Sequence, residues 1–229
     1  MRNLAALAQL AQAQRTENAD RRSSLRAALR SPSKVGTLRE QAKTLAAEAK
    51  VMQQAVYIPG FFPTPPRLGE LMLDYARITP GIVYRWLEPQ AGKGNLAALI
   101  RDRFPSHPLR CIELAPLLCQ VLTDKGFSVI QGDCLQHQGT YDRILMNPPF
   151  ENGQDAAMVR HAYSLLADNG VLVSILSCGP FFRSDRISTD FRAWLETVDY
   201  EIVEDWPADA FKHAERSTGV QTKLLVITK

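Results

Sequence analysis

Residues 86–96 read Trp86-Leu87-Glu88-Pro89-Gln90-Ala91-Gly92-Lys93-Gly94-Asn95-Leu96, which is an apolar strand, an acidic residue and a glycine turn leading into a helix. Gly92 and Gly94 allow the backbone to approach a ligand closely, and the start of the helix offers free N–H groups. A dinucleotide site would need the fuller Gly-x-Gly-x-x-Gly pattern. The turn therefore suits a smaller cofactor that carries a nucleoside.

Three further strands are predicted downstream, and each ends in a polar residue as the first one does. The predicted strands cover residues 109–114, 129–134 and 141–146. The residues at the four strand ends are Glu88, Glu113, Asp133 and Asn147. Taken alone, each of the three acids is most simply explained as a solvated residue at the end of a strand. Together they indicate a site, because doubly wound sheets bind ligands at the carboxyl ends of their strands. Glu113 then suits two ribose hydroxyls, and Asp133 can accept from an adenine amino group.

The motif Asn147-Pro148-Pro149-Phe150 follows the fourth strand directly. A planar nitrogen is a poor nucleophile because its lone pair is delocalised. The Asn147 side-chain oxygen and the Pro148 carbonyl can each accept one N–H, which would turn that lone pair toward an electrophilic methyl group. The two prolines stiffen the turn, and the Phe150 ring can stack on a flat group. Asn-Pro is also a common turn opener, so the motif gains its weight from its neighbours.

This series resembles the class I S-adenosylmethionine-dependent methyltransferases, and its Asn-Pro-Pro-Phe ending resembles the N6-adenine methyltransferases. The element Phe61-Phe62-Pro63-Thr64-Pro65-Pro66 is similar to one that precedes the first strand in many DNA adenine methyltransferases and holds the methionine end of the cofactor. Along the chain, this element comes first, the cofactor motifs follow, and Asn-Pro-Pro-Phe comes last. That order matches the gamma arrangement of the amino-methyltransferases. The resemblance covers about residues 57–229 and is to phage- or plasmid-type bacterial DNA adenine methylases without a separate target-recognition domain.

The resemblance implies S-adenosyl-L-methionine as the cofactor, DNA as the partner and the N6 amine of adenine as the methyl acceptor. The catalytic residues that it implies are Asn147, Pro148, Pro149 and Phe150. The cofactor-binding residues that it implies are Phe62, Thr64, Pro65, Glu88, Ala91, Gly92, Gly94, Glu113, Leu114, Asp133, Cys134 and Asn147. RNA adenine and a protein glutamine are alternative acceptors, because each presents a similar planar nitrogen. An accessory binding protein is a different class, and the intact motif argues against it.

The glycine turn departs from the family pattern at two positions. Lys93 stands where a threonine is usual, and Gln90 stands where a small residue is common. We expect Lys93 to point to solvent. No large target-recognition domain follows the catalytic motif, so we expect any sequence selectivity to come from elsewhere.

The second half of the chain predicts the remaining helices and strands of the domain. Helices are predicted over residues 154–167, ended by Gly170, and over 187–197. Strands are predicted over residues 171–177, 200–206 and 220–228, the last two as antiparallel partners. The fold class that results is α/β: a Rossmann-like class I methyltransferase fold with a seven-stranded mixed sheet, helices on both faces and an N-terminal helical extension.

The loop over residues 177–186 is expected to rise beside Asn147. A duplex base must be flipped out before it is modified, and aromatic stacking holds it. Phe150, Phe181 and Phe182 are therefore candidate substrate-binding residues, although one phenylalanine of the loop is expected to anchor it to the core. Arg183 and Arg186 fit phosphate contacts.

The first 55 residues differ in charge from the rest. They hold ten Lys and Arg against four Asp and Glu, a balance of +6, whereas the whole chain is +3 and the remainder is −3. We interpret residues 1–55 as a basic helical arm, broken near Pro32, and residues 56–229 as the methyltransferase domain. The arm could contact phosphates, pack on a second subunit in a homodimer, or remain a solvated helix. We expect packing with some nucleic-acid contact.

Composition excludes several other classes. The four cysteines and four histidines show no spacing typical of a metal site or disulfide framework, so we expect no metal and a cytoplasmic location. No apolar run approaches about 18 residues, so we expect no membrane span.

Overall fold

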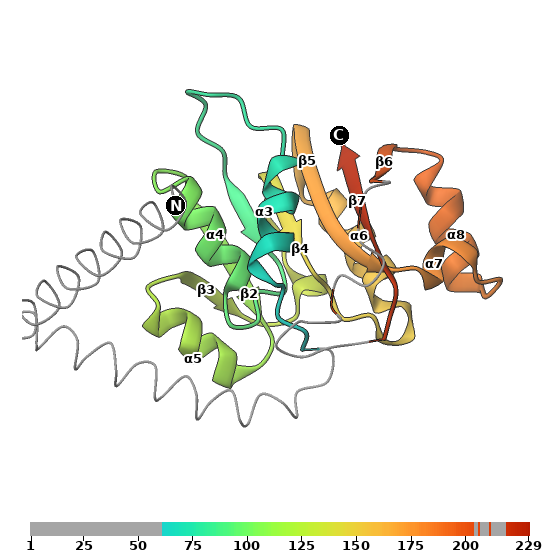
Figure 1. Ribbon diagram of the computed structural model, residues 1–229, viewed down its shortest axis with the longest axis horizontal. Helices are drawn as coiled ribbons and strands as arrows, with labels where there is room; N and C mark the ends of the chain where they lie inside the picture. The colour runs from blue at the N-terminus through green and yellow to red at the C-terminus, as the bar shows by residue number, and fades with distance from the viewer. Residues whose placement is uncertain (1–60, 204–205, 207–210, 212–218) are drawn as a thin grey trace, which may run out of the picture. The chain divides into compact units, whose positions relative to one another are not determined.

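The computed structural model describes residues 61–203, 206, 211 and 219–229. The predicted arm over residues 1–55 lies outside the described residues. Seven strands form one sheet in the order β3-β2-β1-β4-β5-β7-β6 (Figure 1). The strands are β1 (Trp86–Glu88), β2 (Leu109–Glu113), β3 (Ser128–Gln131), β4 (Tyr141–Met146), β5 (Leu166–Ser177), β6 (Asp199–Val203) and β7 (Thr222–Thr228).

The sheet is mixed, as predicted. Strands β1 to β5 pair in parallel, whereas β7 runs antiparallel to both β5 and β6. The strand order reverses between β1 and β4, because β2 and β3 follow β1 in one direction and β4 and β5 extend in the other. In a doubly wound sheet this point opens a crevice beyond the carboxyl ends of the strands.

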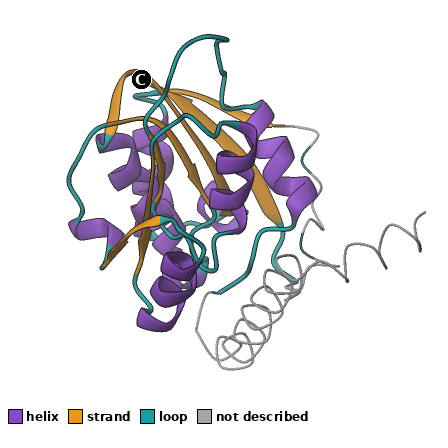
Figure 2. Cartoon of the chain, turned by 90° about the vertical axis from the view of Figure 1, so that its left-hand side faces the viewer, coloured by secondary structure: helices purple, strands orange, loops and turns teal. Residues whose placement is uncertain are grey.

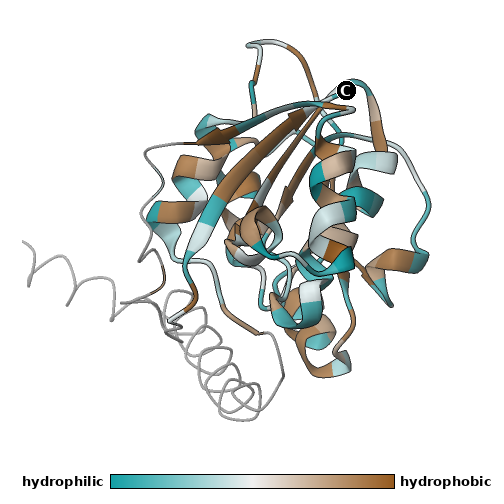
Figure 3. Cartoon of the chain, turned by 90° about the vertical axis from the view of Figure 1, so that its right-hand side faces the viewer, coloured by the Kyte–Doolittle hydropathy of each residue, from teal (hydrophilic) through white to brown (hydrophobic). Residues whose placement is uncertain are grey.

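Helices lie against both faces of the sheet (Figure 2). They are α3 (Pro66–Asp74), α4 (Asn95–Arg103), α5 (Pro116–Asp124), α6 (Gln154–Ser164), α7 (Gly179–Phe182) and α8 (Arg186–Leu195), with short 3-10 turns η1 (Cys134–Gln136) and η2 (Glu151–Gly153). Successive strand residues point to opposite faces. Trp86 accordingly packs in the core beneath α3 and α4, and Leu87 in the core beneath α6 and α8. Because both faces are covered, the central strands are apolar over most of their length (Figure 3).

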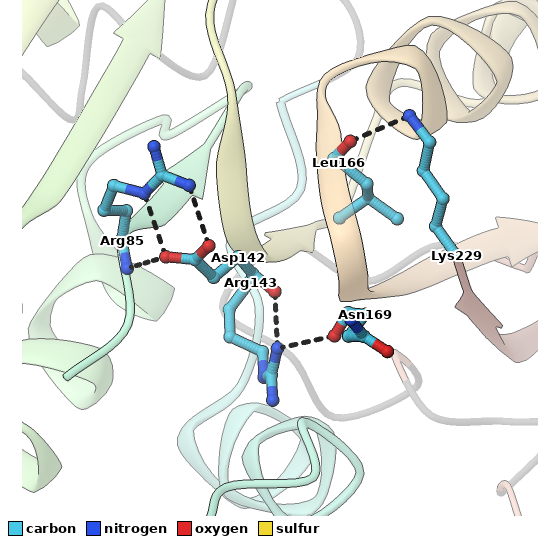
Figure 4. Close-up of polar contacts among 6 residues, drawn as sticks. All are labelled: Arg85, Asp142, Arg143, Leu166, Asn169 and Lys229. Carbon is cyan, nitrogen blue, oxygen red and sulfur yellow. Dashed lines mark hydrogen bonds and ion pairs between the residues drawn. The ribbon is translucent and has the colours of Figure 1, made fainter. Parts of the chain in front are cut away.

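An ion pair joins β1 and β4 at the end of the sheet opposite the crevice (Figure 4). The Arg85 guanidinium donates to both Asp142 oxygens, at 2.8 and 3.0 Å, and the Arg85 backbone N–H donates to the same carboxylate at 2.8 Å. The hydrogen bonds from Arg85 hold the pKa of Asp142 below its ordinary value. Nearby, Arg143 donates to the Asn169 carbonyl and Lys229 to the Leu166 carbonyl. These contacts lie at the amino ends of β4 and β5, where the antiparallel strand β7 ends.

Several predicted boundaries differ from the observed ones. The helix predicted to reach residue 167 ends at Ser164, and Gly170 lies inside β5 rather than capping the helix. Asn169 adopts the left-handed backbone there, with φ 63°, which Asn tolerates better than most residues. A Cβ on Gly170 would lie 2.7 Å from the Ala167 carbonyl, so glycine permits a close approach within an irregular strand.

Two further differences concern the last third of the chain. The strand predicted over 200–206 is described as Asp199–Val203, and Trp206 is not in a strand, whereas residues 204–205 lie outside the described residues. The loop predicted over 177–186 contains the short helix α7, which Pro180 helps to start because its fixed φ suits a first helical turn.

Candidate functional site

A cavity of about 710 Å³ lies at the carboxyl ends of β1, β2, β3 and β4. That volume is typical of pockets for small molecules and cofactors. All the predicted cofactor-binding residues line it except Pro65 and Gly94. Those two are the N-cap residues of α3 and α4, so they set where these two helices begin.

The glycines of the β1–α4 turn are required by backbone geometry. Gly92 and Gly94 adopt the left-handed region, with φ 55° and 85°. A Cβ on Gly92 would lie 3.1 Å from the Phe61 ring, and one on Gly94 would lie 2.8 Å from Leu122. Side chains at either position would therefore be strained and crowded.

Glu113 holds the glycine turn in place. Its two carboxylate oxygens accept the backbone N–H groups of Gly92 and Ala115, each at 2.8 Å. Burial raises the pKa of Glu113, and these backbone hydrogen bonds act in the opposite direction. Each oxygen keeps lone-pair capacity for a further donor in the cavity. Asp133 is arranged similarly: its Oδ1 accepts the Leu135 N–H at 3.0 Å and caps η1.

Glu88 is buried at the end of β1, with a 2% exposed fraction. Burial raises the pKa of its carboxyl well above the ordinary range, a hydrogen bond from the Ala97 backbone lowers it, and the nearby Glu113 raises it further. Its Oε2 has no hydrogen-bond partner among the described residues. A ligand or a water molecule in the cavity would satisfy a buried polar atom of this kind.

The amide of Asn147 has a fixed orientation. Its Nδ2 donates to the Phe62 carbonyl at 2.9 Å and to Thr64 Oγ1 at 3.1 Å. A carbonyl only accepts, so the nitrogen must face Phe62 and the oxygen must face away from it. Oδ1 is buried and has no partner among the described residues. Asn95 holds the same segment from the other side, because its Nδ2 donates to the Thr64 carbonyl at 2.8 Å.

The unpartnered acceptors converge on this cavity. Four buried side-chain polar atoms of the described residues lack a partner, and three of them are oxygens on residues of the cavity wall. These are Glu88 Oε2, Gln90 Oε1 and Asn147 Oδ1. The cavity therefore suits a ligand that presents several N–H or O–H groups.

The other predicted catalytic residues differ in position. Pro149 lines the cavity, whereas Pro148 and Phe150 do not. The Phe150 ring is stacked with Phe62, at a centroid distance of 6.4 Å and an interplanar angle of 18°. It also meets Phe211 edge-on at 6.3 Å. Phe150 is thus absent from the cavity lining and packs on the ring of Phe62, which lines the cavity.

The predicted substrate residues of the α7 region lie outside the cavity. Phe181 packs edge-on against Phe191 at 6.2 Å, so it anchors the loop to the core. Phe182 has a 71% exposed fraction. Arg183 and Arg186 are exposed, and Arg186 pairs with Asp190 at 3.5 Å. Phe182, Arg183 and Arg186 are therefore exposed outside the cavity.

Sequence reasoning missed one part of the wall. Lys93, which we expected to point to solvent, is among the lining residues, and so are residues of η2 and α6. The missed residues from η2 and α6 are Glu151, Asn152, Gln154 and Met158. The sequence signal that could have revealed these residues is the Asn152-Gly153 pair, because Asn-Gly is a strong turn dipeptide. Both residues have positive φ in the structure. The turn brings the start of α6 over the cavity.

Asp155 is a second residue that the sequence analysis missed. It is fully buried, and its Oδ2 accepts from the Ser177 backbone N–H at 3.0 Å and from Ser177 Oγ at 2.7 Å. This contact ties the first turn of α6 to the carboxyl end of β5.

In the part of the chain that the structure describes, no cluster of three or more potential metal ligands occurs, and no helix is long and apolar enough to cross a membrane.

Residues 87–179 match the family model of the methyltransferase small domain. A search of the curated proteins finds no match to this sequence. Among solved structures, the chain resembles a candidate RNA methyltransferase from Pyrococcus horikoshii, with a TM-score of 0.52 and 19% identity over 73% of this chain and 86% of that one. It also resembles the magnesium protoporphyrin IX methyltransferase of Synechocystis PCC 6803, solved with bound cofactor, with a TM-score of 0.51 and 12% identity over 71% and 76% of the two chains.

A third likeness is to precorrin-6y C5,15-methyltransferase from Geobacter metallireducens GS-15, with a TM-score of 0.50 and 12% identity over 70% of this chain and 87% of that one. At these identities the likeness shows the fold. The residues of the cavity fit S-adenosyl-L-methionine, because its ammonium, ribose hydroxyls and adenine amine supply the donors that the unpartnered oxygens need. The described residues thus have the Rossmann-like fold of the class I methyltransferases, and residues 87–179 match the model of the methyltransferase small domain.

Proposed function

We propose that this protein transfers a methyl group from S-adenosyl-L-methionine to the N6 amine of adenine in DNA. The observation that carries the proposal is Asn147 Oδ1, a buried acceptor without a partner on the cavity wall. Because Phe62 and Thr64 hold the amide nitrogen, Oδ1 is the amide atom that can accept an N–H from a ligand. Asn147 opens the motif that resembles the N6-adenine methyltransferases of the gamma arrangement.

The chemistry requires a nitrogen nucleophile to be held in line with the methyl donor. When bound, the cofactor supplies an electrophilic methyl group, and its sulfur keeps the electron pair of the broken S–C bond. Asn147 Oδ1 and the Pro148 carbonyl each accept one N–H of the amine, so positive charge that develops on nitrogen faces two oxygens. The rigid prolines keep these oxygens from moving apart. The surplus proton leaves the methylated nitrogen to water.

The remaining site residues have proposed roles in this scheme. Glu113 binds the ribose hydroxyls, Asp133 the adenine amine of the cofactor, and Thr64 with Phe62 the methionine end. Phe150, which is partly exposed beside Asn147, stacks on the target base. The exposed ring of Phe182 and the exposed guanidinium groups of Arg183 and Arg186 meet the nucleic acid around that base.

RNA adenine is the second candidate acceptor. An RNA base presents the same planar amine, and a candidate RNA methyltransferase is among the similar structures. A protein glutamine side chain presents an equivalent carboxamide. The cavity wall alone favours none of these over the others, and the gamma order of motifs supports DNA.

A transfer assay with radiolabelled methyl cofactor tests the proposal. Purified full-length protein is incubated with separate pools of DNA, RNA and protein, and each product is digested to nucleosides or amino acids. We expect N6-methyladenine from the DNA pool. Labelled RNA or glutamine alone would contradict the DNA assignment, and a protein with Asn147→Ala serves as the background control.

A further inference from the structure

The Gln90 side chain has a role that the site described so far leaves open. Gln90 stands in the β1–α4 turn and lines the cavity. Its Nε2 donates to Cys134 Sγ at 2.7 Å, whereas its Oε1 is buried without a partner among the described residues. An unpaired buried acceptor destabilises a fold, and a donor that arrives with a ligand would remove that cost.

The position of the amide indicates which donor that is. Cys134 directly follows Asp133, whose Oδ1 already accepts the Leu135 N–H. The Gln90 amide thus lies beside the segment that faces the adenine ring in the proposed site. An adenine amine has two N–H groups that point in different directions, so one carboxylate does not satisfy both. Burial raises the pKa of Cys134 to about 11, so its thiol stays neutral, and its sulfur accepts from the Gln90 N–H.

We propose that Gln90 Oε1 accepts the second N–H of the cofactor's adenine amine, so that Gln90 and Asp133 together select a 6-amino purine. The proposal rests on S-adenosyl-L-methionine as the cofactor and on the proposed placement of its adenine at Asp133. It does not depend on which substrate is methylated. Binding measurements without any methyl acceptor therefore test it independently of the proposed function.

The test compares two cofactor products by calorimetric titration of the full-length protein. S-adenosylhomocysteine carries the amine, and S-inosylhomocysteine carries a carbonyl in its place. We expect Gln90→Ala to weaken binding of the adenosyl compound about tenfold, the effect of one lost hydrogen bond of about 1.4 kcal/mol. Binding of the inosyl compound should stay the same or improve, because its carbonyl no longer faces Oε1.

Matched variants separate this role from a structural one. Gln90→Leu fills a similar space without polar atoms and should behave as Gln90→Ala does. Lys93→Ala changes a neighbouring lining residue and should leave the ratio of the two affinities unchanged. An equal loss of both compounds in the Gln90 variants would overturn the proposal, as would a wild-type protein that binds the inosyl compound more tightly.

A wild-type measurement keeps the proposal testable if those variants fail to fold. The N6-methyl form of S-adenosylhomocysteine retains only one N–H on its amine. We expect the wild-type protein to bind it at least about tenfold more weakly than the unmethylated compound, since one acceptor loses its donor. Equal binding of the two compounds would contradict a second acceptor at the amine.

Discussion

Asn147 and Thr64, which are 83 residues apart in the chain, are joined by a hydrogen bond of 3.1 Å from the amide nitrogen to the threonine oxygen. The bond links the element before α3 to the motif after β4, the two features that made the sequence distinctive. Its consequence is that the wall at residues 61–64 and the proposed catalytic amide cannot move independently. A change at Thr64 should therefore affect the chemistry without removing any catalytic atom.

Thr64→Val tests this coupling. Valine has nearly the shape of threonine but removes the acceptor, which leaves one buried N–H of Asn147 unpaired. We expect single-turnover methyl transfer to fall about tenfold, in line with a cost of ~1–3 kcal/mol for an unpaired buried donor. Thr64→Ser keeps the hydroxyl and should stay near the wild-type rate. Equal rates for the valine and serine variants would mean that the bond does not orient the amide.

Asn147→Ala tests the proposed catalytic role itself. The change removes the acceptor for the target amine, so single-turnover transfer should fall by about two orders of magnitude or more. Affinity for S-adenosyl-L-methionine, measured by calorimetry, should change only a few-fold. Near-normal transfer in a folded variant would remove Asn147 from the proposed mechanism.

Glu113 is expected to bind the cofactor in two ways, by its own oxygens and by holding the turn at Gly92. Glu113→Ala should weaken S-adenosyl-L-methionine binding at least about tenfold, since lost hydrogen bonds to a charged group cost ~1.5–3 kcal/mol. Glu113→Gln should also weaken it, because a carboxamide N–H would face one of the two backbone donors. Glu70→Ala, at an exposed acid of α3, is the control and should bind normally.

The sheet and most of the cavity wall could be predicted because both follow from local patterns. Apolar strands, glycine turns and polar strand ends specify a doubly wound sheet whose ligand site lies at the carboxyl ends. The contact between Thr64 and Asn147 could not be predicted, because it depends on how distant segments meet. The same holds for Asp155, whose isolated carboxylate in a helical pattern gave no sign that Ser177 would cover it.

The sequence pattern was least informative where the same residue type can have two different structural roles. Gly170 suggested a helix cap, yet it permits a close backbone contact inside β5. The sequence did not distinguish Phe181 from Phe182. In the structure, α7 turns Phe181 toward the core and Phe182 to solvent. Alternation of burial within a short helix is set by its packing on α8, which the sequence of the loop does not specify.

The stability of the fold should depend on pH through His107. Trp86 Nε1 donates to His107 Nδ1 at 3.0 Å, so that nitrogen must be unprotonated. Burial lowers the pKa of His107 in the folded protein. An unfolded histidine titrates near pH 6.5, so the unfolded chain takes up the proton first as pH falls. The stabilisation is thus complete above about pH 6.5 and is lost toward the lower folded pKa.

Urea unfolding at about pH 7.5 and at about pH 5.5 measures this effect. We expect the wild-type protein to lose more unfolding free energy between the two values than His107→Gln does. Glutamine keeps an acceptor for the buried Trp86 N–H but does not titrate. Parallel losses in the two proteins would show that other groups, such as His137, account for the pH dependence.

The arm over residues 1–55 lies outside the described residues, and its prediction rests on the +6 charge balance of that segment. Replacing Arg21, Arg22 and Arg26 with glutamine in the full-length protein tests whether the arm contacts phosphates. Each lost contact should flatten the slope of log DNA affinity against log salt by about 0.9 unit, because fewer counterions are released on binding. Arg101→Gln, at an exposed arginine of α4 that donates to the Lys125 carbonyl, is the control. If the triple variant keeps the wild-type slope but changes the mass seen by light scattering, the arm serves subunit contact instead of nucleic-acid contact.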